Sequence, residues 1–175
     1  MVNLTRSSEE FFHLQQCMED LNLAWSILKE IQRKRPRGNL LVASFRYALV
    51  EYSKSFKKSF SSDRTKRFML DDQWVPKIYF KLHEEILNQR DTFLAHSDIA
   101  KRDPHVFFDT IGSSRKLLFS RNYIHGLELY PRISEIVLLI EGTLDGLYEY
   151  TDSVEDRYVE ATLQEILQID PNFEK

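Results

Sequence analysis

The sequence predicts a mainly α fold, an up-and-down four-helix bundle with a small β-hairpin inserted between its third and fourth helices. The chain has only five Gly and five Pro against 29% charged residues, which is typical of long solvated helices rather than of a many-stranded sheet. Apolar residues also recur at spacings of three and four in four separate stretches, as they do on one face of a helix. With 42% hydrophobic residues, 1–175 can form a single domain with a substantial core.

The first two helices are predicted to pair antiparallel. We expect the first to begin at Ser7 or Ser8, whose hydroxyl can accept a hydrogen bond from an unpaired amide, and to end near Lys34. Cations, a proline and a glycine in 33–39 then predict a short turn, and a second helix follows over about 39–60. Their apolar stripes are Phe11, Leu14, Met18, Leu21, Trp25 and Leu28 in the first helix, and Leu41, Phe45, Ala48, Tyr52 and Phe56 in the second.

Two prolines mark the starts of the third and fourth helices. The third helix is predicted from Pro76 to about Ser97, and the fourth from Pro131 for more than three heptads. Between them, short aromatic and β-branched runs around Gly112 predict a β-hairpin at about 105–121, whose apolar face should pack on the bundle. The stripes are Tyr79, Leu82, Ile86, Gln89, Phe93 and His96 in the third helix, and Ile133, Val137, Ile140, Leu144, Leu147, Thr151, Val154 and Tyr158 in the fourth. Gly142 and Gly146 could permit close helix approach, or could weaken or bend the segment.

Positive charge is concentrated early in the chain. Residues 1–103 carry 18 Lys/Arg and 14 Asp/Glu, whereas 104–175 carry 6 and 13. A basic, serine-rich segment with interleaved phenylalanines, 53–67, could contact RNA phosphates while its rings stack on bases. Alternatively, it is a cationic helix end followed by a mobile loop that reaches Trp74. The candidate RNA-binding residues are Lys54, Lys57, Lys58, Arg64, Lys66 and Arg67.

The most specific chemical suggestion is RDTFLAHSD, residues 90–98, at the end of the third helix. The histidine side chain can give and take protons near neutrality, and the arginine fork matches phosphate oxygens. Arg90 and His96 therefore suit metal-independent phosphodiester cleavage, in which the ribose 2′-hydroxyl attacks the phosphate, His96 moves a proton and Arg90 stabilises the developing charge. A structural alternative is that His96 ties down the helix end while Arg90 forms an ion pair. Asp98 could orient His96 or cap the following turn.

Helix geometry constrains this pair, because six residues place Arg90 and His96 about 120° apart around an undistorted helix. Three arrangements would still let them act together. The helix could loosen after Leu94, the long arginine side chain could reach round the helix, or the two residues could meet partners across a twofold axis.

The order Arg90, Asp91, four residues and His96, at the end of the third helix of a bundle, resembles the HEPN family, and the Ala-His-Ser-Asp ending is similar to abortive-infection members. The resemblance implies a homodimer with Arg90 and His96 of both subunits in one cleft, and an endoribonuclease of phage defence or toxin–antitoxin systems. Asp91 matches the polar residue that often follows the arginine. The resemblance equally allows a non-catalytic module that binds RNA, nucleotides or protein, including a regulatory or antitoxin partner.

Other classes lack their sequence signatures. The chain has no glycine-rich phosphate loop, HExxH, paired CxxC or GxSxG motif, and its histidines show no metal-ligand spacing, so we expect no metal and no cofactor. No apolar run is long enough to span a membrane, no secretory signal is apparent, and Cys17 is the single cysteine. We therefore expect a cytoplasmic protein with no membrane partner.

Overall fold

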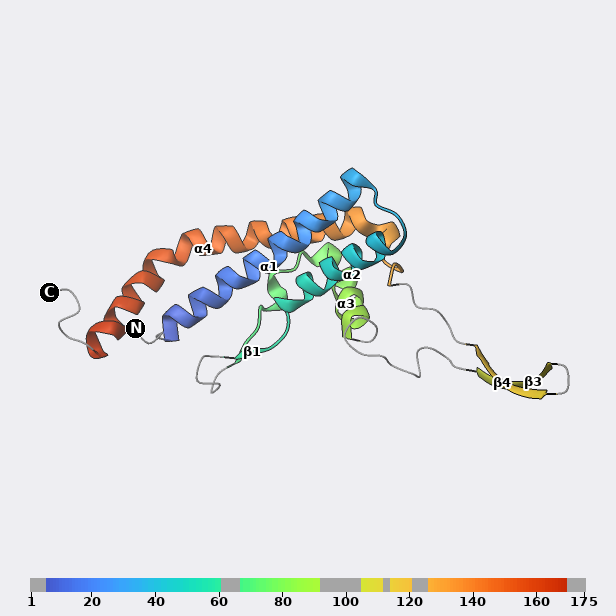
Figure 1. Ribbon diagram of the computed structural model, residues 1–175. Coiled ribbons are helices and arrows are strands. Elements are labelled where there is room, and N and C mark those ends of the chain that lie inside the picture. Colours follow the sequence, from blue (N-terminus) through green and yellow to red (C-terminus); the bar gives the residue numbers. More distant parts are fainter. Residues whose placement is uncertain (1–5, 61–66, 92–104, 112–113, 121–125, 170–175) are drawn as a thin grey trace.

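The computed structural model describes residues 6–60, 67–91, 105–111, 114–120 and 126–169 (Figure 1). The α-helices in these residues are α1 (Arg6–Lys34), α2 (Gly38–Lys54), α3 (Phe80–Gln89) and α4 (Ile133–Ile169). The strands are β1 (Ser59–Phe60), β2 (Arg67–Phe68), β3 (His105–Ile111) and β4 (Ser114–Ser120). Single 3-10 turns cover Asp72–Trp74, Lys77–Tyr79 and Tyr130–Arg132. The predicted mainly helical bundle with an inserted hairpin is thereby confirmed.

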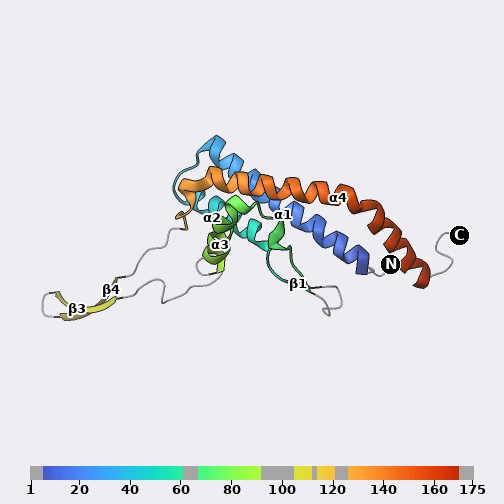
Figure 2. The same ribbon diagram turned by 180° about the vertical axis from the view of Figure 1, so that it is seen from behind.

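The longest pairing joins α1 and α4, which lie side by side in both Figure 1 and Figure 2. Three hydrogen bonds show that the helices are antiparallel. Near the start of α1, the Ser7 hydroxyl donates to Glu165 at 3.0 Å. The Trp25 indole then donates to Glu141 at 2.7 Å, and the Gln32 amide donates to the Ser134 hydroxyl at 3.1 Å. Both helices continue past α2 and α3 at one end, so α4 reaches beyond the central bundle as its sustained apolar pattern predicts.

The turn from α1 to α2 follows the sequence prediction. Arg35 and Gly38 adopt positive φ angles of 47° and 58°, and the Arg35 amide closes α1 on the Ile31 carbonyl at 2.9 Å. A glycine accepts this left-handed backbone without strain, which fits the position of Gly38 at the start of α2. The resulting reversal lays α2 along α1 (Figure 1).

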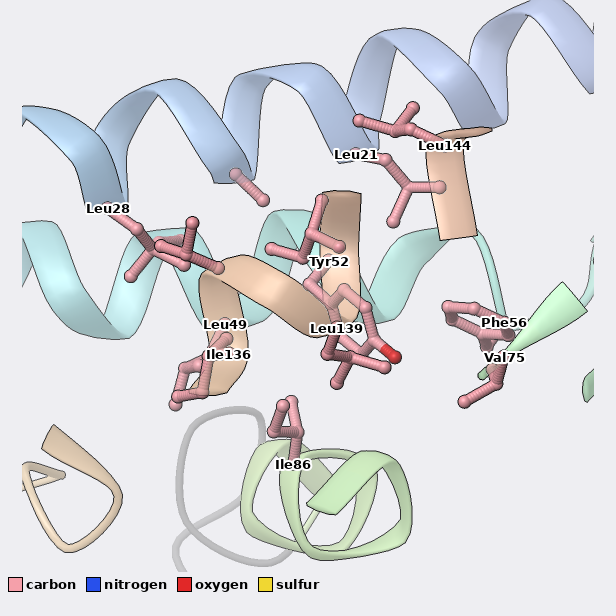
Figure 3. Packing of buried hydrophobic residues seen from close by; sticks show 14 of the residues in the cluster. Leu21, Leu28, Leu49, Tyr52, Phe56, Val75, Ile86, Ile136, Leu139 and Leu144 are labelled. Atoms are coloured by element: carbon pink, nitrogen blue, oxygen red, sulfur yellow. The ribbon is translucent and has the colours of Figure 1, made fainter. Parts of the chain in front are cut away.

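The core lies between the helices and takes in most of the predicted stripes, together with neighbouring residues such as Leu49 and Leu139. Leu21, Leu28, Phe45 and Tyr52 are fully buried, and Ile86 of α3 closes the core from a second side (Figure 3). Figure 3 looks along α3 while α1 and α2 run across the view. The ten residues of α3 therefore lie across the other helices, unlike the side-by-side arrangement of an up-and-down bundle. Apolar periodicity tells which face of a helix is buried, but it does not set the crossing angle.

The end of α2 differs from the prediction. A helix reaching residue 60 is wrong, because α2 ends at Lys54 and the chain turns at Ser55, whose carbonyl accepts the Leu70 amide at 2.9 Å. The predicted loop to Trp74 is wrong as well. In the described part of that segment, β1 pairs antiparallel with β2, and Asp71 caps the 3-10 turn that contains Trp74. Long-range backbone pairing thus replaces the last turn of the predicted helix.

The inserted hairpin is confirmed, with β3 and β4 antiparallel and in register from His105–Ser120 to Ile111–Ser114. Val106 and Leu117 are each 63% exposed. At these two positions the apolar face of the β3–β4 hairpin is therefore exposed, and not packed on the bundle as expected.

The glycines of α4 accommodate the segment that precedes α3. A Cβ on Gly142 would lie 2.7 Å from the Pro76 ring, whereas a Cβ on Gly146 would lie at an ordinary 3.6 Å from the Trp74 ring. Of the two roles predicted for these glycines, Gly142 serves close approach. The approaching group is the Pro76 ring rather than a second helix.

Candidate functional site

The motif arginine lies where α3 changes its winding. Leu82, His83, Ile86 and Gln89 are buried against the bundle, and the α-helix ends at Gln89. The chain then widens into a π-helical turn at Arg90 and Asp91. The Arg90 amide is shared between the carbonyls of Ile86 and Leu87. π-helical turns recur at functional sites.

Arg90 and Asp91 meet the basic segment at Lys57, 34 residues earlier than Asp91. The Lys57 ammonium lies 2.5 Å from one Asp91 carboxylate oxygen, and Nη1 of Arg90 lies 2.9 Å from the other. The side chains of Lys57, Arg90 and Asp91 are 34%, 28% and 46% exposed, so the cluster faces solvent while its stems are partly covered. We call these three residues the Lys57–Asp91–Arg90 cluster. It holds two cations and one carboxylate, and therefore one net positive charge.

The carboxylate of this cluster is held in its charged form. Partial burial alone would raise the pKa of Asp91, but hydrogen bonds from Lys57 and Arg90 outweigh that effect and leave the pKa below its ordinary value. Asp91 stays ionised at neutral pH and fixes both cations. The guanidinium has five N–H donors, more than its contact with Asp91 uses among the described residues.

Gln89 is a polar residue at a position of the α3 stripe where the periodicity predicts a buried side chain, and it is buried as predicted. It is 6% exposed, and its amide donates to Glu128 at 2.9 Å. Its carbonyl oxygen is buried with no hydrogen-bond partner among the described residues. Glu128 also accepts the Gly126 amide at 3.3 Å, so Gln89 connects the end of α3 to the chain that leads into α4.

A second polar group lies one to two turns before the motif, and its importance is not evident from the sequence. The Tyr52 hydroxyl lies 2.7 Å from Nδ1 of His83, and Nε2 of His83 lies 3.3 Å from an Asp72 carboxylate oxygen. The rings of Phe56 and His83 meet edge to face with centroids 4.5 Å apart. Burial lowers the pKa of His83, against the opposing effect of Asp72. Through Tyr52, this neutral, buried histidine anchors α3 to the end of α2, five residues before Lys57.

The remaining predicted residues fall into three groups. Lys54 forms an ion pair with the buried carboxylate of Glu51 at 2.6 Å, and among the described residues its side chain forms no ion pair with the cluster. Lys58 is exposed, and Arg67 lies over the Phe60 ring at 5.5 Å in the β1–β2 pair. His96, Asp98, Arg64 and Lys66 lie outside the described residues, as does any loosening of the helix after Leu94.

The structure thus joins two features that the sequence leaves separate, the basic segment and the arginine of the motif. Lys57 was one of six candidate cations, and nothing in its local sequence marked it as the one that reaches Asp91. A general signal did exist, because a charge at the end of a buried stripe needs a partner of opposite sign. The identity of that partner depends on where α2 ends.

No family model, curated protein or solved structure matches this chain. Within the described ranges, no three His, Cys, Asp or Glu side chains come together as a metal site. Among the helices of that same part of the chain, none has the length and apolar character needed to cross a membrane.

Proposed function

We propose that this chain is a metal-independent endoribonuclease of the HEPN type that works as a homodimer. The observation that carries the proposal is the Lys57–Asp91–Arg90 cluster, in which a cation of the basic segment and the arginine of the motif contact the same carboxylate. Arg90 is partly buried and its guanidinium is fixed on one side by Asp91. Fixed cations stabilise developing negative charge without having to reorganise during the reaction.

In the proposed reaction, the ribose 2′-oxygen attacks phosphorus and the bond to the 5′-oxygen breaks. His96 takes the proton of the 2′-hydroxyl, and the second His96 of the dimer gives a proton to the departing 5′-oxygen. Arg90 donates hydrogen bonds to the non-bridging oxygens, while Lys57 binds a neighbouring phosphate. The products are a 2′,3′-cyclic phosphate and a 5′-hydroxyl, and DNA is not cut because it lacks the attacking hydroxyl.

A second candidate is an RNA-, nucleotide- or protein-binding module without cleavage. The exposed carboxylate of Asp91 favours this binding module. It already pairs with both Lys57 and Arg90, and its negative charge weakens their attraction for phosphate. A role in phage defence or with an antitoxin is compatible with either candidate, as is a cytoplasmic location.

The decisive experiment is cleavage of a mixed RNA pool in EDTA by the full chain and by Arg90→Ala and His96→Ala. We expect cleavage by the unaltered chain only, with cyclic-phosphate ends, and a dimer by light scattering. Arg33→Ala is the control, because Arg33 pairs with the exposed Glu30 at the far end of α1. Cleavage that EDTA abolishes, or that survives in His96→Ala, would contradict the mechanism. RNA binding without any cleavage would select the binding module, and a monomer would exclude the shared cleft.

A further inference from the structure

A groove with a volume of about 540 Å³ lies between the first turns of α1, the chain from β2 to Trp74, and α4. None of the three residues of the Lys57–Asp91–Arg90 cluster lines it. Five of its lining residues carry a ring. They are His13, Phe68, Trp74, Tyr150 and Tyr158, and each of these residues is half-buried. We call this feature the aromatic groove.

The rings form two pairs that join different elements. Trp74 and Tyr150 have centroids 5.0 Å apart, and His13 and Phe68 have centroids 5.5 Å apart. Packing between the rings fixes their positions, which lowers the entropy cost of binding a flat ligand upon their open faces. Half-buried rings in a groove are common stacking platforms for unpaired bases, and each stacked base strengthens binding by about tenfold or more.

Three charged side chains also line the groove: Glu10, Arg67 and Asp71. Arg67 belongs to the basic segment and can reach a phosphate beside a stacked base. Asp71 accepts the Gln73 amide at 2.8 Å through one oxygen, and a carboxylate has lone pairs for further donors. Among the RNA bases, guanine presents two adjacent N–H donors on its pairing edge, which match the two oxygens of one carboxylate.

The aromatic groove adjoins the candidate cleavage site through the start of the β1–β2 pair. The Ser59 hydroxyl lies 3.3 Å from Nδ1 of His13, and Ser59 pairs with Phe68. Lys57 comes two residues before Ser59, a separation of at most about 7 Å between their Cα atoms. A single RNA strand is therefore long enough to contact Lys57 with one phosphate and place a nearby base in the groove.

We propose that the aromatic groove binds one unpaired guanine of an RNA strand, with Trp74 and Tyr150 as the stacking platform, Asp71 as the acceptor and Arg67 on the adjacent phosphate. The choice of RNA as the ligand rests on the proposed function, whereas the base site rests on the groove itself. The groove thereby makes a guanine near the cleaved bond the preferred sequence context.

The test is titration of the full chain and of each variant with GMP, AMP, CMP and UMP, measured by isothermal titration calorimetry, with the NMR signal of the Trp74 indole as a second readout in every chain that keeps Trp74. We expect GMP to bind about tenfold or more tightly than the other three nucleotides. Trp74→Leu should weaken GMP binding by about tenfold or more. Asp71→Asn keeps an N-cap acceptor and should remove the preference for GMP while the protein stays folded. Thermal melting of each variant separates lost binding from lost folding.

Equal binding of the four nucleotides, no GMP binding at millimolar concentration, or unchanged selectivity in Asp71→Asn would overturn the guanine site. Failure of the proposed function has a different signature. GMP binding without RNA cleavage would support the guanine site and contradict the nuclease function. RNA cleavage without GMP binding would support the nuclease function and contradict the guanine site. Arg90→Ala should lose cleavage but keep GMP binding, because Arg90 does not line the groove.

Discussion

Lys57 and Asp91 are joined by a 2.5 Å ion pair that ties the turn after α2 to the end of α3. The same carboxylate holds Arg90 through its second oxygen. This contact holds the basic segment and the motif next to each other. The contribution of each charge can therefore be tested by replacing one side chain at a time.

Replacing Lys57 by Met should weaken RNA binding and lower the slope of log affinity against log salt concentration by about 1, because one phosphate contact is lost. The measurement is fluorescence anisotropy of a labelled RNA between low and physiological salt. Lys34→Met is a matched control, since Lys34 pairs with Glu30 at the far end of α1. Equal salt slopes for Lys57→Met and the unaltered chain would remove Lys57 from the RNA site.

Replacing Asp91 by Asn should tighten RNA binding, because the carboxylate no longer competes with phosphate for Lys57 and Arg90. The folded chain should become slightly less stable at pH 7, by less than about 1 kcal/mol, since Asp91 is 46% exposed and solvent screens the pair. The pKa of Asp91 lies below its ordinary 3.8, so this stabilisation is present above about that pH and is lost as pH falls through the folded-state value. Urea unfolding at pH 7 and pH 3 should show the two proteins converging at low pH. A stability difference that grows on acidification would contradict this assignment.

The two glycines of α4 should respond oppositely to alanine. Gly146→Ala should raise the free energy of unfolding by about 0.5–1 kcal/mol, because alanine favours the helix and its methyl group meets Trp74 at an ordinary distance. Gly142→Ala should lower it, because the methyl group would lie 2.7 Å from the rigid Pro76 ring. Urea unfolding measures both, and each variant serves as the control for the other. Equal effects would mean that Pro76 does not constrain α4.

Acidification should destabilise the chain through His83. Burial lowers the pKa of this histidine below 6.5, so the unfolded state binds the proton more readily than the folded state. The stabilisation is complete above about pH 6.5 and is lost as pH falls toward the folded-state pKa. His13 acts in the same direction, since burial lowers its pKa too. Urea unfolding between pH 7.5 and 5 should show the loss, and constant or rising stability would contradict it.

Tyr52→Phe tests the same anchor without a change of charge. It leaves Nδ1 of His83 without the hydroxyl 2.7 Å away and should cost about 1–3 kcal/mol. A loss well below this range, measured by urea unfolding at pH 7.5, would show that the hydrogen bond contributes little. Tyr47→Phe is the control, because Tyr47 lies on the exposed side of α2 with 50% of its surface accessible.

The sequence by itself determined the number and type of the main elements, the turn at Arg35–Gly38 and most of the buried face of each helix, but not buried residues beside the predicted stripes such as Leu49 and Leu139. Leu21, Phe45 and Ile86 could be assigned to the core because helical periodicity is a local property that depends on each segment alone. The inserted hairpin could be predicted for the same reason, from its short strands and intervening glycine.

Only the tertiary structure decided where α2 ends, how α3 crosses the bundle, and which cation meets Asp91. The Ser55 carbonyl and the Leu70 amide are far apart in sequence, yet their hydrogen bond ends α2 before residue 60 and thereby turns Lys57 toward α3. The aromatic groove likewise gathers rings from three distant segments. Periodicity fixes which face of a helix is buried, but the pairing of remote charges and rings depends on crossing angles and backbone contacts that no single segment encodes.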